Sequence, residues 1–541
     1  MARRLATASE HDVVVLGSGA AGLVAALAAS DAGAEVEIYE KASHIGGTTA
    51  VSGGMVWIPA NPHQAELGVK DTVEDGVSYL MSLSHGLLDE EIVRTLVEAG
   101  PGVISWLEAS TPLRLQVIEG YPDYQPEHPG GLPGGGRSLE CPLFSFDQLG
   151  RWSSAILKPA RAVNVMLHEL PMGGGSGVVA EDALQARRAR DERGIGQALV
   201  GALLAGCLAR SIEPVCNARA LELIVEGGRV CGARVLIDGE IAEVRARKGV
   251  VLATGGFERD RELVRSFLRG PMNAPTGAES NTGDGLRMAM RLGAALGNMR
   301  EAWWVPVMYV PDASGGVRPL LVNRERTLPR SIIVNRFGRR FVNEAANYNA
   351  LGGAFHVFDA ARFDYTNLPC WLIFDHDYMR RYGIGESPPS DHAPEWLTSA
   401  ETIPELARMV GVDPSGLPAT VASFNDDASR GRDTAFGRGE SAYDRWAGDR
   451  TEQGARATLG PLQTPPFHAI EIHPGCLGTS GGPRTDEKAR VLDVDGEVIP
   501  GLYAAGNVMA GPTGMAYGGA GGTLGPAIVF GCIAGRESAC G

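Results

Sequence analysis

The fold is decided by residues 12–22, which read DVVVLGSGAAG. The apolar run before Gly17 predicts a buried parallel strand, and the Ala- and Leu-rich run from 23 to 29 predicts a helix directly after it. The three glycines permit a tight turn, close approach of a pyrophosphate and close contact between helix and strand. Free N–H groups and the dipole at the helix N-terminus favour the phosphates. The segment therefore predicts a dinucleotide-binding site formed by Gly17, Gly19, Ala20, Ala21 and Gly22.

A second strand and an acidic residue follow at the expected interval. Residues 35–40, EVEIYE, predict a strand that ends in Glu40, an acid suited to the hydroxyls of a ribose. The residues after it are unusually small, so the backbone can pack against a flat ring and its ribityl-phosphate tail, which favours FAD over NAD. The predicted cofactor contacts in this stretch are Lys41, Gly47, Thr48, Thr49, Ser52, Gly53 and Gly54.

Length and composition bound the class of protein. A chain of 541 residues is long enough for two domains and a large core. The net charge of −15 argues against a nucleic-acid partner, and no apolar run reaches the roughly 18 residues that a membrane-spanning helix needs. The eight cysteines show no CxxC or metal-like spacing, which is typical of free thiols in a reducing compartment. We expect a cytoplasmic protein and read residues 1–10 as a frayed leader rather than an export signal.

The middle of the chain predicts the rest of a nucleotide-binding sheet. A helix is expected from residue 194, and three strands at 221–225, 230–237 and 243–246 are expected to form a β-meander. The sheet then resumes at 249–257, GVVLATGGF, which is similar to a second flavoprotein fingerprint. Its predicted cofactor contacts are Ala253, Thr254 and Gly255.

The last part of the chain returns to the cofactor. The strand at 501–507 ends in a glycine turn that we expect to meet the flavin, and a helix from 527 to about 533 has Pro526 in its first turn. Its N-terminus is expected to face the flavin pyrimidine edge and to favour the negative charge of reduced flavin. The predicted contacts here are Gly506, Asn507, Thr523 and Leu524.

The pattern changes between these segments, so the fold class is α/β with an insertion. We predict a Rossmann-like FAD-binding domain, built on a parallel sheet with a β-meander, from residues 1–283 and 456–541. Residues 284–455 are expected to form an inserted α+β domain that is catalytic or caps the site.

Several short motifs occur in order over nearly the whole length. Besides the FAD fingerprints they are YPDY at 121–124, AWWVP at 302–306, NEAANY at 343–348, GTSGG at 478–482, GLYAAGN at 501–507 and YGGAG at 517–521. With these motifs the chain resembles the 3-ketosteroid Δ1-dehydrogenases, in the superfamily of FAD-dependent fumarate reductases and succinate dehydrogenase flavoproteins.

The resemblance implies non-covalent FAD and desaturation of the carbon–carbon bond next to a ring ketone. It assigns the Tyr517 hydroxyl and the Gly521 N–H to the ketone oxygen, and Tyr348 to the proton on the adjacent carbon, while hydride passes to flavin N5. Tyr124 would support Tyr348, with Tyr121 as the alternative. Two preorganised donors stabilise the developing enolate. A tyrosine base, with an ordinary pKa near 10, needs cationic or dipolar surroundings.

Some departures and alternatives stay open. Gly518 stands where the family usually has proline, so we expect a looser loop, which leaves the ring size and the desaturated bond undecided. A smaller ketone such as 4-oxocyclohexanecarboxylate is an alternative, with Arg330 holding its carboxylate.

Two further readings are a fumarate-reductase-like enzyme and a flavoprotein without catalytic activity. A fumarate reductase needs a proton-donating arginine and cationic clamps. The expected arginine position holds Thr327, although Arg324 and Arg326 lie nearby and His473 is a possible polar contact. The expected partners are a small apolar ketone, steroid-like or monocyclic, and an unidentified electron acceptor.

Overall fold

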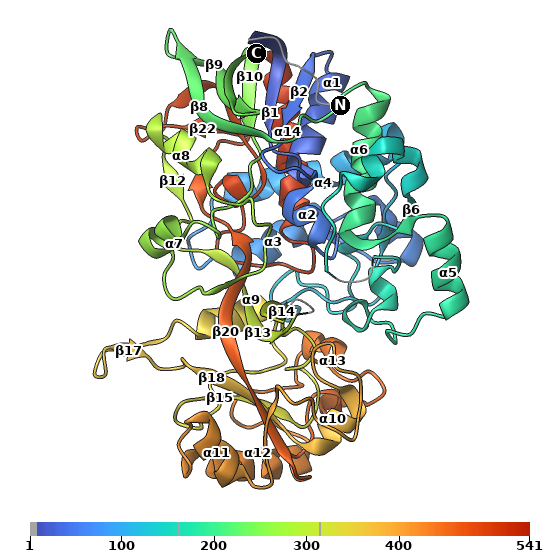
Figure 1. The fold of residues 1–541 in the computed structure, drawn as a ribbon, viewed down its shortest axis with the longest axis vertical. Coiled ribbons are helices and arrows are strands. Elements are labelled where there is room, and N and C mark those ends of the chain that lie inside the picture. Colours follow the sequence, from blue (N-terminus) through green and yellow to red (C-terminus); the bar gives the residue numbers. More distant parts are fainter. Residues whose placement is uncertain (1–7, 161–162, 313–314) are drawn as a thin grey trace.

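The computed structural model describes residues 8–160, 163–312 and 315–541, and two sheets organise it (Figure 1). The first sheet has parallel pairs between β2 and β1, β1 and β10, and β10 and β23, as expected for a nucleotide-binding sheet. Its strands in order are β2 (Val36–Tyr39), β1 (Ala8–Leu16), β10 (Glu240–Leu252), β23 (Val498–Ala504) and β22 (Arg490–Leu492). The predicted strand at 12–16 is confirmed, but it begins at Ala8, so residues 8–10 are not frayed; residues 1–7 lie outside the described chain.

The β-meander is confirmed with one correction. β8 (Ala218–Glu226) pairs with β9 (Arg229–Ile237), and β9 pairs with β10, both antiparallel. The predicted strand at 243–246 and the fingerprint strand at 249–252 are one continuous strand, β10. Strand β1 pairs with residues 243–246 of β10 and again with residues 249–252, and the register shifts once between them, at His11 and Val13 of β1. Gly249 therefore does not interrupt the strand.

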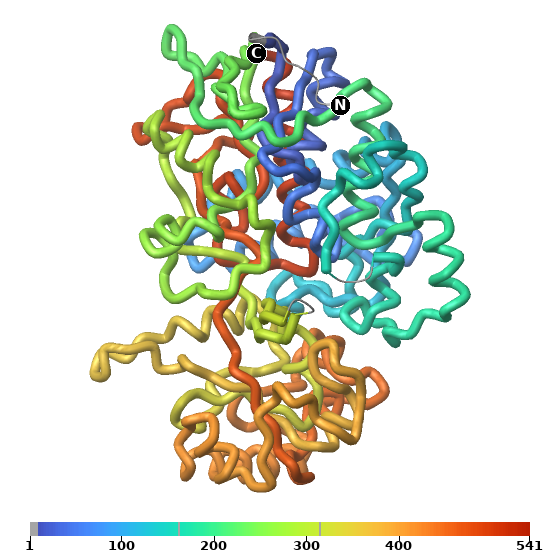
Figure 2. Tube along the Cα trace, viewed as in Figure 1, coloured from blue at the N-terminus to red at the C-terminus, as the bar shows by residue number. Residues whose placement is uncertain are grey.

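Two helices from opposite ends of the chain pack side by side on this sheet. They are α1 (Ala20–Asp31) and α14 (Leu524–Cys540), drawn in blue and red in Figures 1 and 2. A Cβ on Gly531 would lie 2.6 Å from the Ala21 oxygen, so the backbones meet only because this residue is glycine. Both predicted helices are confirmed, and α14 begins three residues earlier than expected.

Helix α6 (Ile195–Ala209) follows Gly194, as expected. Residues 70–110 contain α3 (Val73–Ser82) and α4 (Glu90–Ser110). Residues 120–137 carry no helix or strand, as their proline and glycine content predicts. No helix within the described residues is long and apolar enough to cross a membrane, and all eight cysteines are free thiols.

The second sheet forms the lower part of Figure 1. Its path is β14 (Val317–Leu321), β13 (Ala302–Pro311), β20 (Phe467–Thr479), β18 (Cys370–Phe374) and β15 (Ser331–Asn335), with β11 (Ala274–Pro275) and β19 (Thr398–Ala400) also on β20. The long strand β20 rises from this sheet toward the cofactor domain, as its red-orange tube shows in Figure 2. β20 lies within residues 456–541, which we assigned to the FAD-binding domain, although it pairs with the strands of the second sheet. A division of the chain by its sheets would therefore place the second boundary after β20. The division at 283/284 and 455/456 stays a prediction.

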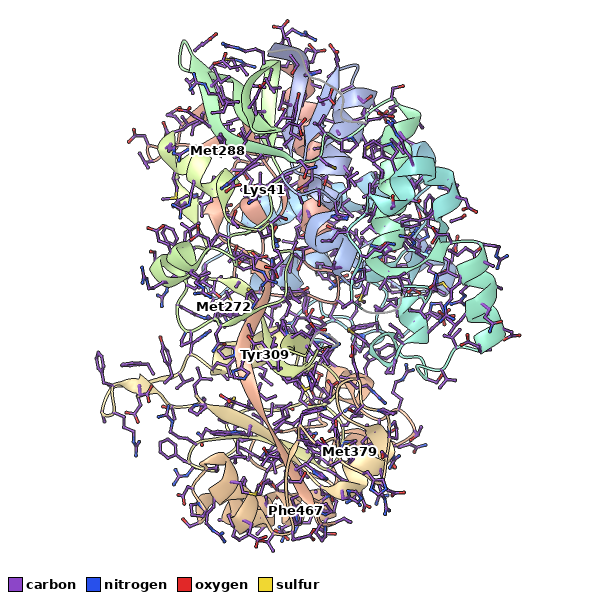
Figure 3. All side chains as sticks on the ribbon, viewed as in Figure 1. Lys41, Met272, Met288, Tyr309, Met379 and Phe467 are labelled. Atoms are coloured by element: carbon purple, nitrogen blue, oxygen red, sulfur yellow. The ribbon has the colours of Figure 1, made fainter. Side chains whose placement is uncertain are left out.

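Separate hydrophobic clusters cover the two faces of the second sheet. Met379, in α10 (His376–Tyr382), belongs to one cluster and Phe467 to the other. Both are labelled in the lower part of Figure 3, whereas Lys41 and Met288 lie in the upper part. The segment 425–455 includes α13 (Ala442–Ala447), whose Tyr443 is buried.

Candidate active site

The glycines of the first fingerprint shape a cradle that side chains would fill. Gly17 has φ of +110°, and a Cβ there would lie 2.2 Å from the Ala253 oxygen on the neighbouring strand. A Cβ on Gly22 would lie 2.0 Å from the Gly17 oxygen. Gly19 is different, because its nearest neighbour would be Thr49 Oγ1 at 3.6 Å. Gly17 and Gly22 therefore bring strand and helix together, while Gly19 leaves open space where a pyrophosphate can approach.

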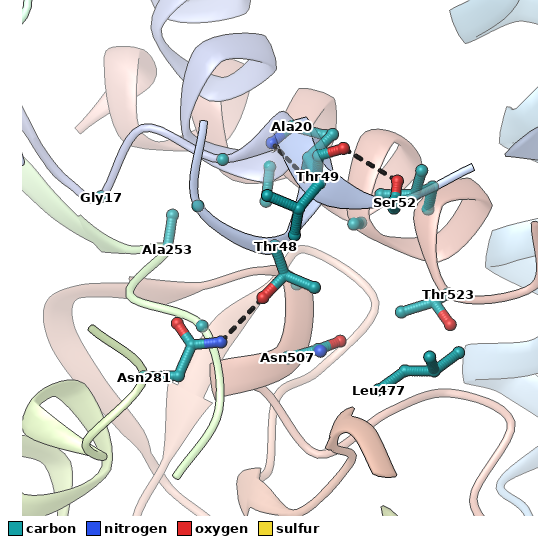
Figure 4. Close-up of a pocket in the computed structure, with 18 of the residues that line it drawn as sticks. Gly17, Ala20, Thr48, Thr49, Ser52, Ala253, Asn281, Leu477, Asn507 and Thr523 are labelled. Carbon is teal, nitrogen blue, oxygen red and sulfur yellow. Dashed lines mark hydrogen bonds between the residues drawn. The ribbon is translucent and has the colours of Figure 1, made fainter. Parts of the chain in front are cut away.

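Threonine hydroxyls line the space beside this turn, as Figure 4 shows. Thr49 Oγ1 accepts a hydrogen bond from the Ala20 N–H at 3.1 Å, at the start of α1. Thr48 Oγ1 accepts from Asn281 Nδ2 at 2.9 Å. The Thr254 hydroxyl is buried and has no partner among the described residues. An unpaired buried hydroxyl on the cavity wall is what a bound polar ligand would satisfy.

Glu40 and Lys41 are held in place by the protein itself. Glu40 Oε2 accepts from Ser18 N at 3.0 Å and Ser18 Oγ at 2.6 Å, and Oε1 accepts from Ala42 N at 2.8 Å. A carboxylate has further lone pairs for ribose hydroxyls. Lys41 Nζ lies 3.1 Å from Asp284 Oδ2, so its charge is already paired.

One cavity joins nearly all the predicted site residues. From the cofactor set it is lined by Gly17, Gly19, Ala20, Ala21, Glu40, Lys41, Gly47, Thr48, Thr49, Ser52, Gly53, Gly54, Ala253, Thr254, Gly255, Gly506, Asn507, Thr523 and Leu524. From the predicted catalytic set it is lined by Tyr124, Tyr348, Tyr517 and Gly521, and also by the alternative Tyr121. Gly22 lies beneath the turn instead. The residues present thus fit a long dinucleotide such as FAD with a second ligand beside it.

Three tyrosine hydroxyls form a chain at one end of this cavity. Tyr124 Oη donates to Tyr348 Oη at 2.9 Å, and Tyr348 Oη donates to Tyr517 Oη at 3.2 Å. The Tyr517 oxygen lies 3.0 Å from Thr523 Oγ1, just before α14. The rings of Tyr124 and Tyr517 stack with centroids 5.1 Å apart. Segments separated by hundreds of residues therefore converge on one hydrogen-bonded unit.

Tyr348 is the first residue of α9 (Tyr348–Ala354), and Asn347 caps this helix by accepting from the Ala350 N–H at 2.9 Å. Asn347 Nδ2 also donates to the backbone carbonyl oxygen of Tyr124 at 3.4 Å. The cap therefore holds Tyr348 beside the Tyr124 loop.

Gly521 presents an unused donor next to these hydroxyls. Its N–H donates no hydrogen bond to any residue that the structure describes. Its φ is +101°, and a Cβ would lie 2.6 Å from both Trp57 N and Val56 N. Only glycine fits this position, and the free N–H can serve an incoming oxygen atom.

The loop around Gly518 is firmly tied rather than loosened, which corrects our expectation. The Gly518 oxygen accepts from the Tyr124 N–H at 2.9 Å and from Tyr79 Oη at 2.7 Å. A Cβ on Gly518 would lie 2.9 Å from the Trp57 ring, so close packing takes the place of a proline ring. The same contacts fix Tyr124 relative to Tyr517.

Burial strongly affects the acidity of the tyrosines. It raises the pKa of Tyr348 well above its usual value, and the neighbouring Tyr517 raises it further. Burial also raises the pKa of Tyr517 and of Tyr124. A proton-accepting tyrosine here therefore needs a compensating positive charge.

The residues expected to act in the keto-acid and fumarate-reductase alternatives lie outside the cavity. Arg330 Nη1 pairs with Asp375 at 2.8 Å, outside the cavity, and Thr327 Oγ1 donates to the Ala447 oxygen at 2.6 Å. The His473 ring packs on Tyr309 with centroids 5.1 Å apart and does not line the cavity. No arginine lines the part of the cavity that the structure describes. The charged clamps that a dicarboxylate requires are thus missing from the described wall.

Several wall residues were missed by sequence reasoning. The polar stretch 276–284 supplies Asn281, and its composition could have indicated a cofactor loop. Ser18 sits inside the fingerprint and holds Glu40. No sequence signal marks the apolar wall, because it comes from unrelated segments: Met172, Pro319, Leu320, Leu321 and Leu477.

Comparison with known proteins agrees with this geometry. Residues 12–524 match the sequence model of a family described as the FAD binding domain. The chain is 40% identical to the 4-oxocyclohexanecarboxylate 2-dehydrogenase of Sinomonas cyclohexanicum, over 98% of this chain and 93% of that protein. It is also 40% identical to the 3-oxosteroid 1-dehydrogenase of Mycobacterium tuberculosis, over 98% of both chains.

A solved structure shares the whole fold. The 3-ketosteroid Δ1-dehydrogenase of Sterolibacterium denitrificans, in complex with 1,4-androstadiene-3,17-dione, superposes with a TM-score of 0.92 at 34% identity. The match covers 98% of this chain and 100% of that one.

Proposed function

The chain belongs to the family of flavoproteins with this FAD binding domain and, within it, to the 3-ketosteroid Δ1-dehydrogenases, and we propose that it desaturates the carbon–carbon bond next to a ring ketone. The proposed substrate is a 3-ketosteroid, and the proposed site of desaturation is its 1,2-bond. FAD, bound without a covalent link, supplies the hydride acceptor when present. The observation that carries the proposal is the chain of tyrosine hydroxyls beside the unused Gly521 N–H in the cofactor cavity.

The first role is to bind and polarise the ketone. Tyr517 and Gly521 both line the cavity, and the Gly521 N–H has no hydrogen-bond acceptor among the described residues. Two donors on one carbonyl oxygen stabilise the negative charge that develops when the adjacent carbon loses a proton. Because Gly521 is held against the backbone of Trp57, this donor needs no reorganisation during the reaction.

The second role is to take the proton. We assign it to Tyr348, whose oxygen lies 3.2 Å from that of Tyr517 and is therefore close to the carbon beside a ketone held there. Tyr124 supports it through the 2.9 Å hydrogen bond to the same oxygen, whereas the Tyr121 ring packs on Trp446. These contacts support Tyr124 rather than Tyr121 as the helper.

The cavity wall supports a neutral, apolar substrate. Beyond the tyrosines it is lined by Met172, Pro319, Leu320, Leu321 and Leu477. The cation on the described wall is Lys41, and it is paired with Asp284. A substrate carboxylate would be buried there without a partner, which costs several kcal/mol. A steroid ketone therefore suits the wall better than a keto acid.

A smaller cyclic ketone is the second candidate. The observation that favours it is the 40% identity to 4-oxocyclohexanecarboxylate 2-dehydrogenase over nearly the full length. Its carboxylate cannot be held by Arg330, which pairs with Asp375 outside the cavity.

One set of mixing experiments tests these alternatives. The FAD-loaded enzyme is mixed anaerobically with a 3-ketosteroid, with 4-oxocyclohexanecarboxylate and, after chemical reduction, with fumarate. We expect the steroid to bleach the flavin absorbance. Bleaching by the keto acid alone would select the second candidate, and reoxidation by fumarate alone would contradict both.

We further propose that the enzyme works in the cytoplasm and passes its electrons to a separate acceptor. The eight free thiols support a reducing compartment. Activity measured with a quinone, with a second flavoprotein and with oxygen identifies the acceptor.

A further inference from the structure

Arg326 lies completely buried in the connection between β14 and β15. Its Nε donates to the Val322 oxygen at 3.1 Å, and its Nη1 donates to the Ala346 oxygen at 2.5 Å and to the Glu344 oxygen. The Glu344 and Ala346 carbonyls belong to the segment that ends at Tyr348. The guanidinium therefore holds the backbone from which the proposed proton acceptor projects.

The charge of Arg326 is not neutralised by a salt bridge. All three of its hydrogen bonds go to backbone carbonyls, and it forms no ion pair within the described residues, while its Nη2 is buried without any acceptor there. Arg340 and Arg438 are also buried, but both pair with the Glu344 carboxylate, at 2.6 and 3.2 Å. A buried cation without a carboxylate is costly. Its presence calls for a function that needs positive charge.

The groups that face Arg326 belong to the tyrosine cluster. Tyr443 and Asp444 of α13, Tyr124 of the loop at 120–137 and the adjacent Glu325 all act electrostatically on the Arg326 guanidinium. The Tyr443 ring lies 5.0 Å from the Tyr124 ring, edge to face. Burial raises the pKa of both carboxyl groups, Asp444 and Glu325, and neither forms an ion pair with Arg326 within the described residues.

Arg326 also acts against the effect of burial on its neighbours. Burial raises the pKa of Tyr443 to about 12, and the positive charge of Arg326 opposes that rise. Tyr348 itself is faced by Tyr517, Tyr124 and Tyr121, and none of these carries a charge when protonated. Arg326 therefore acts on this cluster through Tyr443 and Tyr124.

We propose that Arg326 is a positioning residue for this reaction: it fixes the 344–346 backbone that presents Tyr348, and its unpaired charge stabilises the phenolate form of the tyrosine cluster. The inference rests on the proposed function. In the step that it assists, the carbon–hydrogen bond beside the ketone breaks, and its proton forms a bond to the Tyr348 oxygen, which goes from phenolate to phenol. The electron pair of that bond enters the new carbon–carbon double bond, while hydride leaves the neighbouring carbon for the FAD.

The test compares pH profiles of kcat/KM for a 3-ketosteroid between pH 6 and 10, with FAD-loaded enzymes. Arg326→Met removes the charge and Arg326→Lys keeps it. Arg438→Met is the matched control, because Arg438 is equally buried but its main neighbouring charges are Glu344, Arg340, Asp433 and Asp444. The tyrosine on which it acts, Tyr378, does not line the cavity. Flavin absorbance and circular dichroism verify that each variant is loaded and folded.

We expect the rising limb of the profile to move up by about one pH unit or more in Arg326→Met, which is a loss of about tenfold at neutral pH. The loss should disappear above the limb, and Arg326→Lys and Arg438→Met should keep the wild-type limb. A uniform loss at every pH in Arg326→Met would overturn the proposal, because it would indicate a purely structural role. A wild-type profile without a rising limb would overturn it as well.

The outcome separates this inference from the proposed function. Wild-type enzyme that does not reduce its flavin with any ring ketone would contradict the proposed function. Active wild-type enzyme with an unmoved limb in Arg326→Met contradicts only the role of Arg326. If Arg326→Met does not fold, Arg326→Gln takes its place, and an upward shift in Arg326→Lys equal to that in Arg326→Gln would refute the role of charge.

Discussion

Replacing Gly521 by alanine is the sharpest steric test of the proposed carbonyl site. The added Cβ would lie 2.6 Å from Trp57 N and from Val56 N, whereas an ordinary contact begins near 3.4 Å. The loop must therefore move by about 0.8 Å, and the φ of +101° adds strain of about 1–3 kcal/mol for a residue with a side chain. Both effects displace the N–H that we assign to the ketone oxygen.

The expected loss follows from that displacement. Removal of one donor from such a site costs roughly 10²–10³ in kcat, about 3–4 kcal/mol, and a misplacement near 1 Å costs about 10². We expect kcat/KM of Gly521→Ala for a 3-ketosteroid to fall by about 10²–10³ with FAD still bound.

Gly522 offers a matched control next to it in the chain. Its φ is not positive, and a Cβ would lie 3.1 Å from the Gly519 oxygen and 3.4 Å from the Tyr517 ring, which small shifts accommodate. Both variants are assayed by anaerobic flavin reduction, with flavin content measured by absorbance. Equal turnover in Gly521→Ala and Gly522→Ala would refute the role of the Gly521 N–H.

Three further predictions concern other parts of the account. Tyr348→Phe should lose about 10²–10⁴ in kcat while keeping FAD, since only the base is removed, and near-normal turnover would contradict the assignment. Gly17→Val should purify without FAD, because its Cβ would meet the Ala253 oxygen at 2.2 Å; a fully yellow variant would show that the site is elsewhere. Burial raises the pKa of Glu258 from 4.5 to about 7, so the folded state holds a proton that the unfolded state has lost. The contribution of Glu258 to the free energy of unfolding is fully present below pH 4.5 and falls by about 3 kcal/mol as the pH rises to 7, at about 1.4 kcal/mol per pH unit. Denaturant midpoints of the FAD-loaded protein at pH 5 and pH 8 should show this loss. The midpoints of Glu258→Gln should not show it.

The cofactor half of the site was predictable because its signals are local. A buried strand, a glycine turn and a small-residue helix occur within residues 12–29, and the structure places β1 and α1 there. Gly17 and Gly22 must be glycine because a Cβ at either position would clash with backbone atoms, and this holds for any sequence with this turn. Glu40 was predictable as an acid at the end of β2, but its hold on Ser18 was not.

The catalytic half could not be derived from local patterns. Tyr124, Tyr348 and Tyr517 come from distant segments, so only a resemblance to a known family could bring them together before the fold was seen. Two buried residues near these tyrosines were not recognised: Tyr443 was not singled out, and Arg326 was considered only for the fumarate-reductase alternative. Burial and charge compensation are properties of the folded chain, so no local pattern reveals them. The strand β10 was divided at Gly249, since a glycine in a strand usually marks an interruption.

The most direct test of the account is the identity of the product. The FAD-loaded enzyme is incubated anaerobically with one equivalent of a 3-ketosteroid that has a saturated 1,2-bond, and the steroid is then examined by mass spectrometry and NMR. We predict a product lighter by two hydrogens, with the new double bond at the 1,2-position and one flavin reduced per steroid. An unchanged steroid, or a double bond elsewhere in the ring system, would contradict the assignment of Tyr348, Tyr517 and Gly521.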